Sequence, residues 1–495
     1  MKHDSSVIRK ELISVLEIAP VSTLSQHSIN AIMVAIVAVA LLLRIGSAFY
    51  QGNLVTDLPG IYDQISYHEL ARRLLDGYGF SFGHDHWPAT RAGEPTAHWS
   101  YLYTVYLAGV YALFGTQPVI ARLIQAVIAG LLHSWLAWRI GRQLFGQTIG
   151  LMVAALSAVY IYFFYYAGAL VTETFYILGI LWTFDVAFRL ATVEPKVRDA
   201  TGPLEPWRLW CELGVAIGVT VLLRQLFLLF VPFLFFWLWW YGPNRRAALI
   251  VRRQRFAPLK GWVMNGFTCT TLIIVLMIAP WTIRNYLVFD TFVPLNTNAG
   301  FAFFWGNHPI YGTHFVGILP ADGPSYFDLI PKASLDLNEA KLDRDLLQRG
   351  IGFILDDPVR FLFLSLSRTV EYFKFWPSPE SGFISNIARV GSFGLLLPFM
   401  LYGLLYSTIR LRRPQGWKQS AGIILFYLFI VVYTGIHLLT WTLIRYRLPV
   451  DAVLLFFAAI GLVQLGQQLT PKVLCHLHGF NFAGTKRIRY KQNEG

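Results

Sequence analysis

The feature that most constrains this chain is a series of long apolar runs separated by short charged segments. Runs of about 17–25 apolar residues are long enough to cross a bilayer as helices. Only helices and closed barrels can cross, because each backbone polar group needs a partner within lipid. The runs are continuous and lack a two-residue alternation, which favours helices over a barrel. With 55% hydrophobic and 14% charged residues, the chain is expected to be an all-α integral membrane protein.

The hydropathy pattern predicts about ten transmembrane helices, within a range of roughly 8–13. The expected spans are 29–50, 118–138, 148–167, 174–190, 209–223, 226–241, 262–281, 390–409, 420–440 and 449–467. Two large polar loops interrupt them, at about 51–117 and 282–389, and both are expected on the outer face with juxtamembrane amphipathic helices. Residues 1–470 then form one polytopic domain, followed by a basic cytoplasmic tail at 471–495.

The net charge of +13 does not indicate nucleic-acid binding, because of where the basic residues lie. Lysine and arginine gather in short segments between the apolar runs, as the positive-inside rule expects of cytoplasmic loops. The bilayer is therefore the expected partner, and no nucleic acid is expected. We predict a multi-pass protein of the cell membrane, either an inner or a plasma membrane.

Asp63 lies in the first outer loop, directly before a stretch with the apolar spacing of an amphipathic helix. Ser66 and Glu69 fit a capping box, which predicts that this helix begins near Ser66. Two roles are open for Asp63. It can cap the helix, since aspartate is a favoured N-cap residue, or it can act as a carboxylate base toward an attacking acceptor group.

Glu173 is an acidic residue at the predicted outer end of two spans. An ionisable residue at membrane depth is a candidate for function, so Glu173 is a candidate catalytic residue beside Asp63, although an acid at a helix N-terminus also stabilises the helix. A metal site built from His84, Asp85 and His86 is conceivable. Three nearly consecutive loop residues rarely complete one tetrahedron, however. We therefore expect no metal site and no cofactor.

The stretch DQISYHELARRLLDGYG at 63–79 resembles the first outer loop of GT-C-type polytopic glycosyltransferases. The resemblance is closest to family 39, the group of protein mannosyltransferases and lipid A aminoarabinose transferases. It extends from about residue 40 to 465. Further segments that support it are PTAHWSYLYTVYL at 95–107, RIGRQLFG at 139–146, the run from PWTIRN at 280 to WGN at 307, and RYRLP at 445–449.

This resemblance implies a sugar donor linked to a polyprenyl phosphate and an inverting transfer at the outer face. Asp63 is at the position of the catalytic acidic residue of the first loop. Two departures concern the acceptor and the base: Asp63 is followed by Gln64 where many members have a second acid, and Ser100 replaces a proline. The acceptor, whether a glycan, a lipid or a protein, is not indicated.

A lipid-linked phosphate needs cations at the membrane interface, and arginine can donate two hydrogen bonds to phosphate. Arginines at predicted outer ends lie on the side that the positive-inside bias disfavours. Arg284 and Arg445 are the preferred phosphate ligands, with Arg447, Tyr446 and Arg224 as further candidates; interfacial anchoring is the alternative for each. His98, Asn285 and Asn307 are candidates for contacts with the sugar or acceptor, or for ordinary hydrogen bonds within the loops.

Two other classes of function remain open. A transporter or flippase of a lipid-linked sugar needs polar residues at mid-membrane and broken helices, but here the polar residues concentrate in two outer loops and Asp185 is an exception. An O-antigen ligase or polymerase also uses polyprenyl carriers. We expect the transferase.

Overall fold

The computed structural model describes residues 25–57, 62–192, 207–241, 257–320, 322–379, 381–411 and 417–478. In these ranges the chain is helical and contains no strand beyond two isolated bridges, Ser81–Pro95 and His86–Thr90. This confirms the all-α prediction. The helices are α2 (Gln26–Gln51), α3 (Asp63–Leu75), α4 (Tyr101–Phe114), α5 (Pro118–Phe145), α6 (Gln147–Val159), α7 (Ile161–Gly168), α8 (Glu173–Thr192), α9 (Trp207–Leu223), α10 (Val231–Tyr241), α12 (Ala257–Phe289), α13 (Ala299–Asn307), α14 (Glu339–Asp356), α15 (Pro358–Tyr372), α16 (Phe383–Arg389), α17 (Leu395–Leu411), α18 (Trp417–Leu439) and α19 (Leu448–His478).

Within the described residues, 7 helices are long and apolar enough to cross a membrane, and the bent pair α6–α7 raises this number to 8. The helix axis bends by 50° between α6 and α7. The remaining two expected spans, 209–223 and 226–241, correspond to shorter helices of 17 and 11 residues, α9 and α10. A 3₁₀ turn at Gln225–Leu229 separates them. The predicted number of about ten spans is therefore not confirmed.

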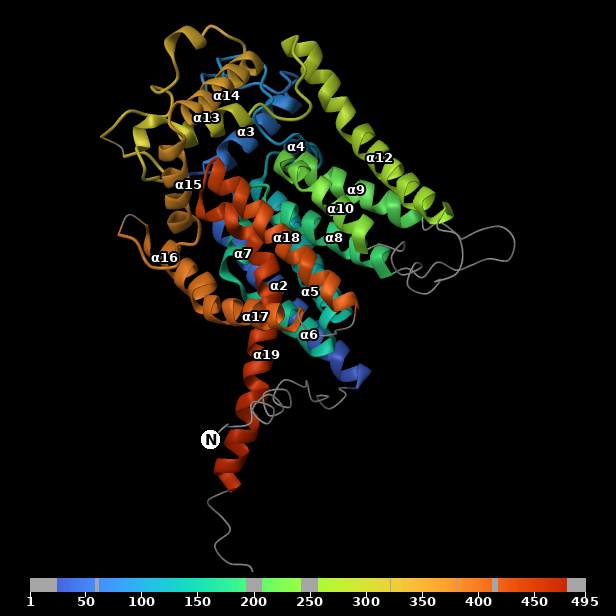
Figure 1. Ribbon diagram of the computed structural model, residues 1–495. Helices are drawn as coiled ribbons and strands as arrows, with labels where there is room; N and C mark the ends of the chain where they lie inside the picture. Colours follow the sequence, from blue (N-terminus) through green and yellow to red (C-terminus); the bar gives the residue numbers. More distant parts are fainter. Residues whose placement is uncertain are drawn as a thin grey trace, which may run out of the picture.

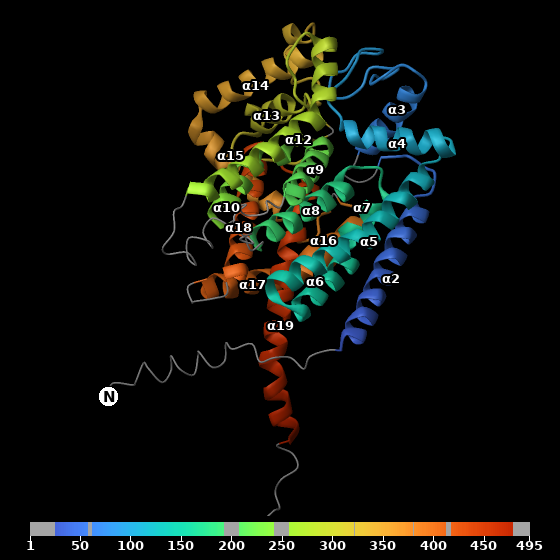
Figure 2. The same ribbon diagram turned by 90° about the vertical axis from the view of Figure 1, so that its right-hand side faces the viewer.

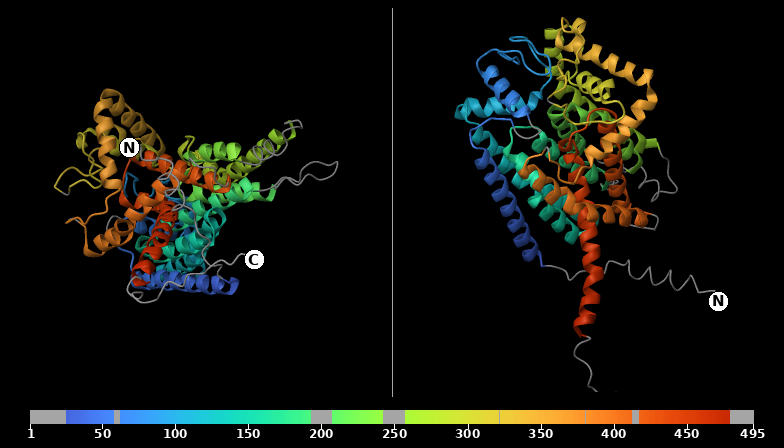
Figure 3. Two further views of the ribbon diagram at one scale, coloured as in Figure 1. Left: turned by 60° about the horizontal axis from the view of Figure 1, so that its bottom comes forward. Right: turned by 90° about the vertical axis from the view of Figure 1, so that its left-hand side faces the viewer.

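The two large polar segments gather at one end of the helical bundle, around α3, α4, α13 and α14 (Figures 1 and 2). The first residues of α2 and the last residues of α19 lie toward the opposite end. Figure 3 shows α2 along the outside of the bundle and the end of α19 extending beyond it. Residues 471–478 of the expected basic tail belong to α19, whereas 479–495 lie outside the described residues.

The two polar segments are joined by a buried carboxylate, Glu339, at the start of α14. It accepts hydrogen bonds from Thr90 Oγ1 at 2.9 Å, from Ala97 N at 2.7 Å, and from Thr297 Oγ1. Buried carboxylates need partners of this kind, because an unsatisfied charge in a dry site costs several kcal/mol. Glu339 therefore holds residues 90–97 of the first segment against the second.

Helix α3 begins three residues earlier than the capping-box pattern predicts. Its first residue is Asp63, its N-cap is Tyr62, and no side chain caps it. Ser66 lies inside the helix, and its hydroxyl contacts His86 Nε2 at 2.8 Å instead of a backbone amide. The N-cap interpretation of Asp63 and the capping box at Ser66 are therefore both wrong.

Candidate active site

Two acids and two arginines from four different elements meet at the end of the bundle that carries the polar segments. Arg445 Nη1 lies 2.7 Å from Asp63 Oδ2 and 3.8 Å from Glu173 Oε1. Arg224 Nη2 donates to the same Glu173 oxygen at 2.6 Å, and its Nε donates to Thr172 Oγ1 at 2.8 Å. We call Asp63, Glu173, Arg224 and Arg445 the charged cluster.

Local backbone structure places each member of the cluster. Asp63 and Glu173 are the first residues of α3 and α8, where the helix dipole favours a negative charge. Arg224 precedes the 3₁₀ turn after α9, and Arg445 lies in the 3₁₀ turn Ile444–Arg447 that leads into α19. Backbone that leaves the α-helical path at membrane depth is tolerated where it is buried in protein or lines a cavity. These breaks direct both arginines inward.

The charged cluster balances in charge but not in hydrogen bonding. Its side chains range from 1% exposed for Glu173 to 19% for Asp63 and Arg224. In the described part of the chain, neither Glu173 Oε2 nor Arg445 Nε has a hydrogen-bond partner. Buried polar atoms in native proteins are nearly always paired, and exceptions often mark a binding or catalytic site. The cluster can therefore accept further polar groups from a ligand.

Aromatic side chains enclose the two guanidinium groups. The ring of Tyr446 lies 5.6 Å from the Arg224 guanidinium carbon and 5.3 Å from that of Arg445. His437 stacks on Tyr446 with 5.0 Å between the ring centres, and Tyr176 lies 5.8 Å from Arg224. The sequence analysis missed His437 and Tyr176, since both lie in apolar spans where nothing in the local pattern marks them.

Tyr67 follows Asp63 by one helical turn and is also buried. Burial, reinforced by the Asp63 charge, raises the pKa of Tyr67 well above its usual value. Its phenol therefore remains protonated and neutral beside the cluster. Its oxygen accepts a hydrogen bond from the Ser100 amide at 3.4 Å, so the residue that replaces the family's proline has a partner here.

The structure does not bring Arg284 or Arg447 into the charged cluster. Arg284 donates to the carbonyl oxygens of Thr96 at 2.9 Å and Phe80 at 3.4 Å, which ties α12 to the first polar segment. Arg447 is fully buried and pairs with Asp451 at 2.9 Å. Both have protein partners, and their assignment as phosphate ligands stays a prediction.

The three candidates for sugar or acceptor contacts are also held by protein groups. Asn285 donates to the Leu295 carbonyl at 2.8 Å, and Asn307 Oδ1 accepts from Arg368 at 2.9 Å. His98 packs among aromatic rings, and its burial lowers its pKa, so the ring is neutral. Asn285 and Asn307 thus make ordinary hydrogen bonds within the protein, the alternative that the sequence analysis left open for them.

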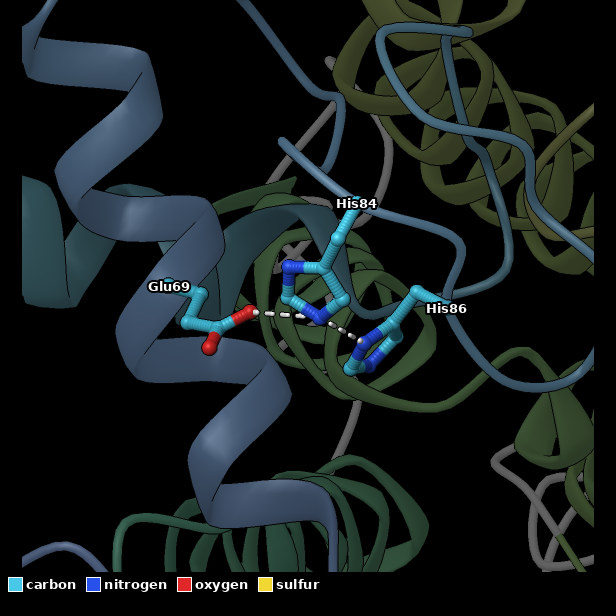
Figure 4. Close-up of side chains that lie close together, drawn as sticks. All are labelled: Glu69, His84 and His86. Carbon is cyan, nitrogen blue, oxygen red and sulfur yellow. Dashed lines mark hydrogen bonds and ion pairs between the residues drawn. The ribbon is translucent and has the colours of Figure 1, made fainter.

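One group of side chains in the described residues has the composition and spacing of a metal site. It combines Glu69 of α3 with His84 and His86 of the following loop (Figure 4). Asp85, which the sequence analysis grouped with these histidines, accepts instead from the Ala92 amide at 2.9 Å. The group is separate from the charged cluster in its contacts.

Comparisons with known proteins are consistent with this architecture. The family model described as dolichyl-phosphate-mannose-protein mannosyltransferase matches residues 100–283. No curated protein matches the sequence.

Solved structures share the fold at low sequence identity. The archaeal oligosaccharyltransferase AglB from Archaeoglobus fulgidus, in complex with an inhibitory peptide and a dolichol-phosphate, has a TM-score of 0.55 at 15% identity. That match covers 95% of this chain and 53% of AglB, so the chain spans about half the length of AglB. An oligosaccharyltransferase of Archaeoglobus fulgidus in the apo form gives a TM-score of 0.56 at 15% identity, over 92% of this chain and 52% of that chain.

ArnT from Cupriavidus metallidurans, bound to undecaprenyl phosphate, matches with a TM-score of 0.46 at 15% identity, over 90% of this chain and 63% of ArnT. The family model thus covers less than half of this chain, and the likeness to AglB shows a shared fold over 95% of this chain.

Proposed function

We propose that the protein transfers a sugar from a polyprenyl-phosphate carrier to an acceptor at the outer membrane face, with inversion at the anomeric carbon. The observation that carries this proposal is the charged cluster, where a carboxylate and an arginine pair across 2.7 Å at the polar end of the bundle. The AglB structure contains a dolichol-phosphate, which supports a lipid-linked donor here.

The chemistry requires a base and a stabilised leaving group. Asp63 accepts the proton of the acceptor as its oxygen or nitrogen attacks the anomeric carbon. The bond between that carbon and the phosphate oxygen breaks, and its electron pair leaves with the polyprenyl phosphate. The phosphate gains a negative charge in this step, which the fixed guanidinium groups of Arg445 and Arg224 stabilise.

The contacts of Arg445 suggest an order of events. Arg445 is paired with the Asp63 carboxylate. A phosphate that binds Arg445 competes with this carboxylate, because guanidinium binds both groups in the same planar geometry. Donor binding thereby releases Asp63 for its role as base.

Glu173 has a different role in this proposal from the catalytic one assigned by sequence. Its side chain is 1% exposed, and one oxygen faces both Arg224 and Arg445. A buried carboxylate between two arginines offsets their mutual repulsion and fixes their positions. We therefore assign Glu173 to positioning the phosphate-binding arginines.

Asp185, the charged residue within a span that favoured a transporter, has a structural explanation. Asp185, the mid-span acid, is paired with Arg139 and Arg189 at 2.9 Å each. An acid that already has two basic partners, Arg189 on its own helix α8 and Arg139 on α5, is accounted for by structure. An O-antigen ligase or polymerase uses similar carriers and differs in its acceptor, so it is distinguished by product.

The test uses purified full-length protein in proteoliposomes with a radiolabelled polyprenyl-phosphate sugar and a panel of membrane and envelope acceptors. Asp63→Asn is expected to lower transfer by about 10²–10⁴-fold, the usual contribution of a general base, while donor binding is retained. The matched control is Asp76→Asn, an exposed carboxylate at the other end of α3. Full transfer by Asp63→Asn rejects the role of Asp63. Movement of donor across the bilayer without transfer to any acceptor supports the transporter instead.

A further inference from the structure

The strongest feature that the transferase proposal leaves unused is the group formed by Glu69, His84 and His86. Their candidate ligand atoms all lie within 4.8 Å of one another. His84 Nε2 is 3.8 Å from Glu69 Oε2 and 3.4 Å from His86 Nδ1. Two imidazoles and one carboxylate are the ligands of many zinc sites. We propose that these three residues bind a divalent transition metal, with Zn²⁺ as the best fit.

The spacing suits a tetrahedral ion. Zinc binds nitrogen and carboxylate oxygen at about 2.0–2.2 Å, so neighbouring ligand atoms in a tetrahedron lie about 3.3–3.5 Å apart. One of the observed separations already has this value, and side-chain rotation suffices for the others, since Glu69 and His84 are partly or largely exposed. Figure 4 shows the three side chains directed toward one another from α3 and from the loop.

The backbone explains why two residues of the loop are suitably placed. His84 lies beside Glu69 of α3 and beside His86, whereas the Asp85 carboxylate accepts a hydrogen bond from the Ala92 amide instead. The His86 amide and carbonyl pair with Thr90 at 2.8 and 2.9 Å, which holds this stretch in place.

His86 also has the outer contacts of a metal ligand. Its Nε2 lies 2.8 Å from Ser66 Oγ, which leaves Nδ1 directed at His84. Metal-binding histidines usually contact a polar group through their second nitrogen, and this contact fixes the ring and its tautomer. The buried ring of Phe82 stacks on His86 with 3.7 Å between ring centres, which restricts its rotation further.

The site has a structural consequence and an open position. Three protein ligands leave one tetrahedral position for water or another small ligand, and the exposure of His84 permits exchange with the outside. The metal would clamp residues 84–86 onto α3, the helix whose first residue is Asp63. It is thus expected to stabilise the first polar segment, and the inference does not depend on the transferase proposal.

The test is metal binding by the full-length protein, purified in detergent with a tag that contains no histidine and freed of metal by a chelator. Isothermal titration with Zn²⁺ is expected to show one site per chain, and Co²⁺ is expected to give the intense visible absorption of a tetrahedral site. His84→Ala and Glu69→Gln each remove a ligand, so they should weaken Zn²⁺ binding by more than the roughly 10–100-fold that loss of an outer contact costs, and they should reduce the Co²⁺ bands. Zn²⁺ should also raise the melting temperature of the wild type but not of His84→Ala.

The matched controls are Asp85→Asn, the neighbour that accepts from the Ala92 amide, and His314→Ala, an exposed histidine of the other polar segment. Both should bind Zn²⁺ as the wild type does. The proposal is overturned if the wild type binds no stoichiometric Zn²⁺, or if His84→Ala and Glu69→Gln bind it as tightly as the controls. His84 is exposed, so its replacement tests binding without threatening the fold.

Discussion

Two arginines only two positions apart, Arg445 and Arg447, have opposite environments. Arg445 is 10% exposed and faces two acids at the cluster, of which Asp63 is 19% exposed. Arg447 is fully buried, pairs with Asp451 at 2.9 Å and donates to the Tyr372 carbonyl at 2.7 Å. Tyr160 donates to the other Asp451 oxygen at 2.8 Å. Arg447 therefore contributes to stability, and Arg445 is the one available to a ligand.

This contrast makes a prediction about paired substitutions. Arg447→Met leaves the Asp451 charge buried without its partner, which typically costs about 3–5 kcal/mol of stability. Arg445→Met should cost less, because Asp63 is partly exposed and Glu173 keeps Arg224. Thermal unfolding in detergent measures both effects, and donor binding should be lost in Arg445→Met. The double variant Arg447→Met/Asp451→Leu should recover stability; equal melting temperatures for the two single variants would contradict this assignment.

Asp343 of α14 gives a prediction for pH. It accepts from the amides of Gly300 and Phe301, yet burial dominates and raises its pKa from 3.8 to about 7. Because the folded state holds this proton more tightly than the unfolded state, its contribution to stability is present at about pH 4 and falls as pH rises to 7. Asp343→Asn keeps the acceptor oxygen but carries no charge, so it should raise the melting temperature at pH 8 by roughly 2–5 °C and have little effect at pH 4.

The control for Asp343 is Asp336→Asn, whose side chain is 94% exposed. This variant should follow the wild type at both pH values. If Asp343→Asn also follows the wild type between pH 4 and 8, the carboxyl of Asp343 titrates normally and the proposed cost of its ionisation is absent.

At the scale of elements, α13 and α14 approach so closely at Gly300 that no side chain fits. A Cβ at this position would lie 1.7 Å from the Asp343 carbonyl oxygen, which is backbone and cannot rotate away. Gly300→Ala therefore has to push the helices apart, and overpacking of this kind costs about 1–3 kcal/mol. Gly352→Ala, in α14 with no atom within 4 Å, is the matched control. It should be neutral or slightly stabilising, because alanine is the better helix former.

Limited proteolysis of the second polar segment measures this effect. Gly300→Ala should be cut faster than the wild type between α13 and α14, and Gly352→Ala should not. Unchanged cleavage of Gly300→Ala would show that the two helices can separate without cost.

Several elements were predictable from the sequence, because hydropathy and turn residues act locally. The apolar runs predicted the long spans, and acids and arginines near predicted outer ends included the four members of the charged cluster. The predicted start of α3 was too late along the chain. Ser66 contacts His86 and Glu69 contacts His84 in the following loop, so neither side chain caps the end of the helix. A local pattern cannot show such a competing partner.

At the scale of the whole molecule, the sequence could not decide which arginine meets which acid. Arg284 and Arg445 share the same predicted depth, but packing joins Arg284 to the carbonyls of Thr96 and Phe80 and joins Arg445 to Asp63. The metal-binding group likewise unites a helix with a loop 15 to 17 positions away. Contacts of this kind depend on the tertiary arrangement, which hydropathy and motif spacing do not encode.

The arrangement of the whole molecule predicts its orientation in the membrane. Both polar segments lie at one end of the bundle, and the start of α2 lies toward the other (Figures 1 and 2). Asp63 of the charged cluster is the first residue of α3, one of the helices at the polar end. Arg142 and Arg189 occupy the last turns of α5 and α8, the helices that lead away from the polar end. The positive-inside rule places those turns in the cytoplasm and the cluster outside.

Cysteine labelling tests this orientation. In a variant with the three native cysteines replaced, Thr313→Cys marks an exposed position of the second polar segment, and Ser25→Cys marks an exposed position before α2. A membrane-impermeant thiol reagent should label Thr313→Cys in right-side-out vesicles and Ser25→Cys only in inverted ones. The reverse pattern would put Asp63 and Arg445 on the cytoplasmic side, where transfer at the outer face is impossible. Since the two sites differ only in the side of the membrane, either pattern decides where the charged cluster meets its donor.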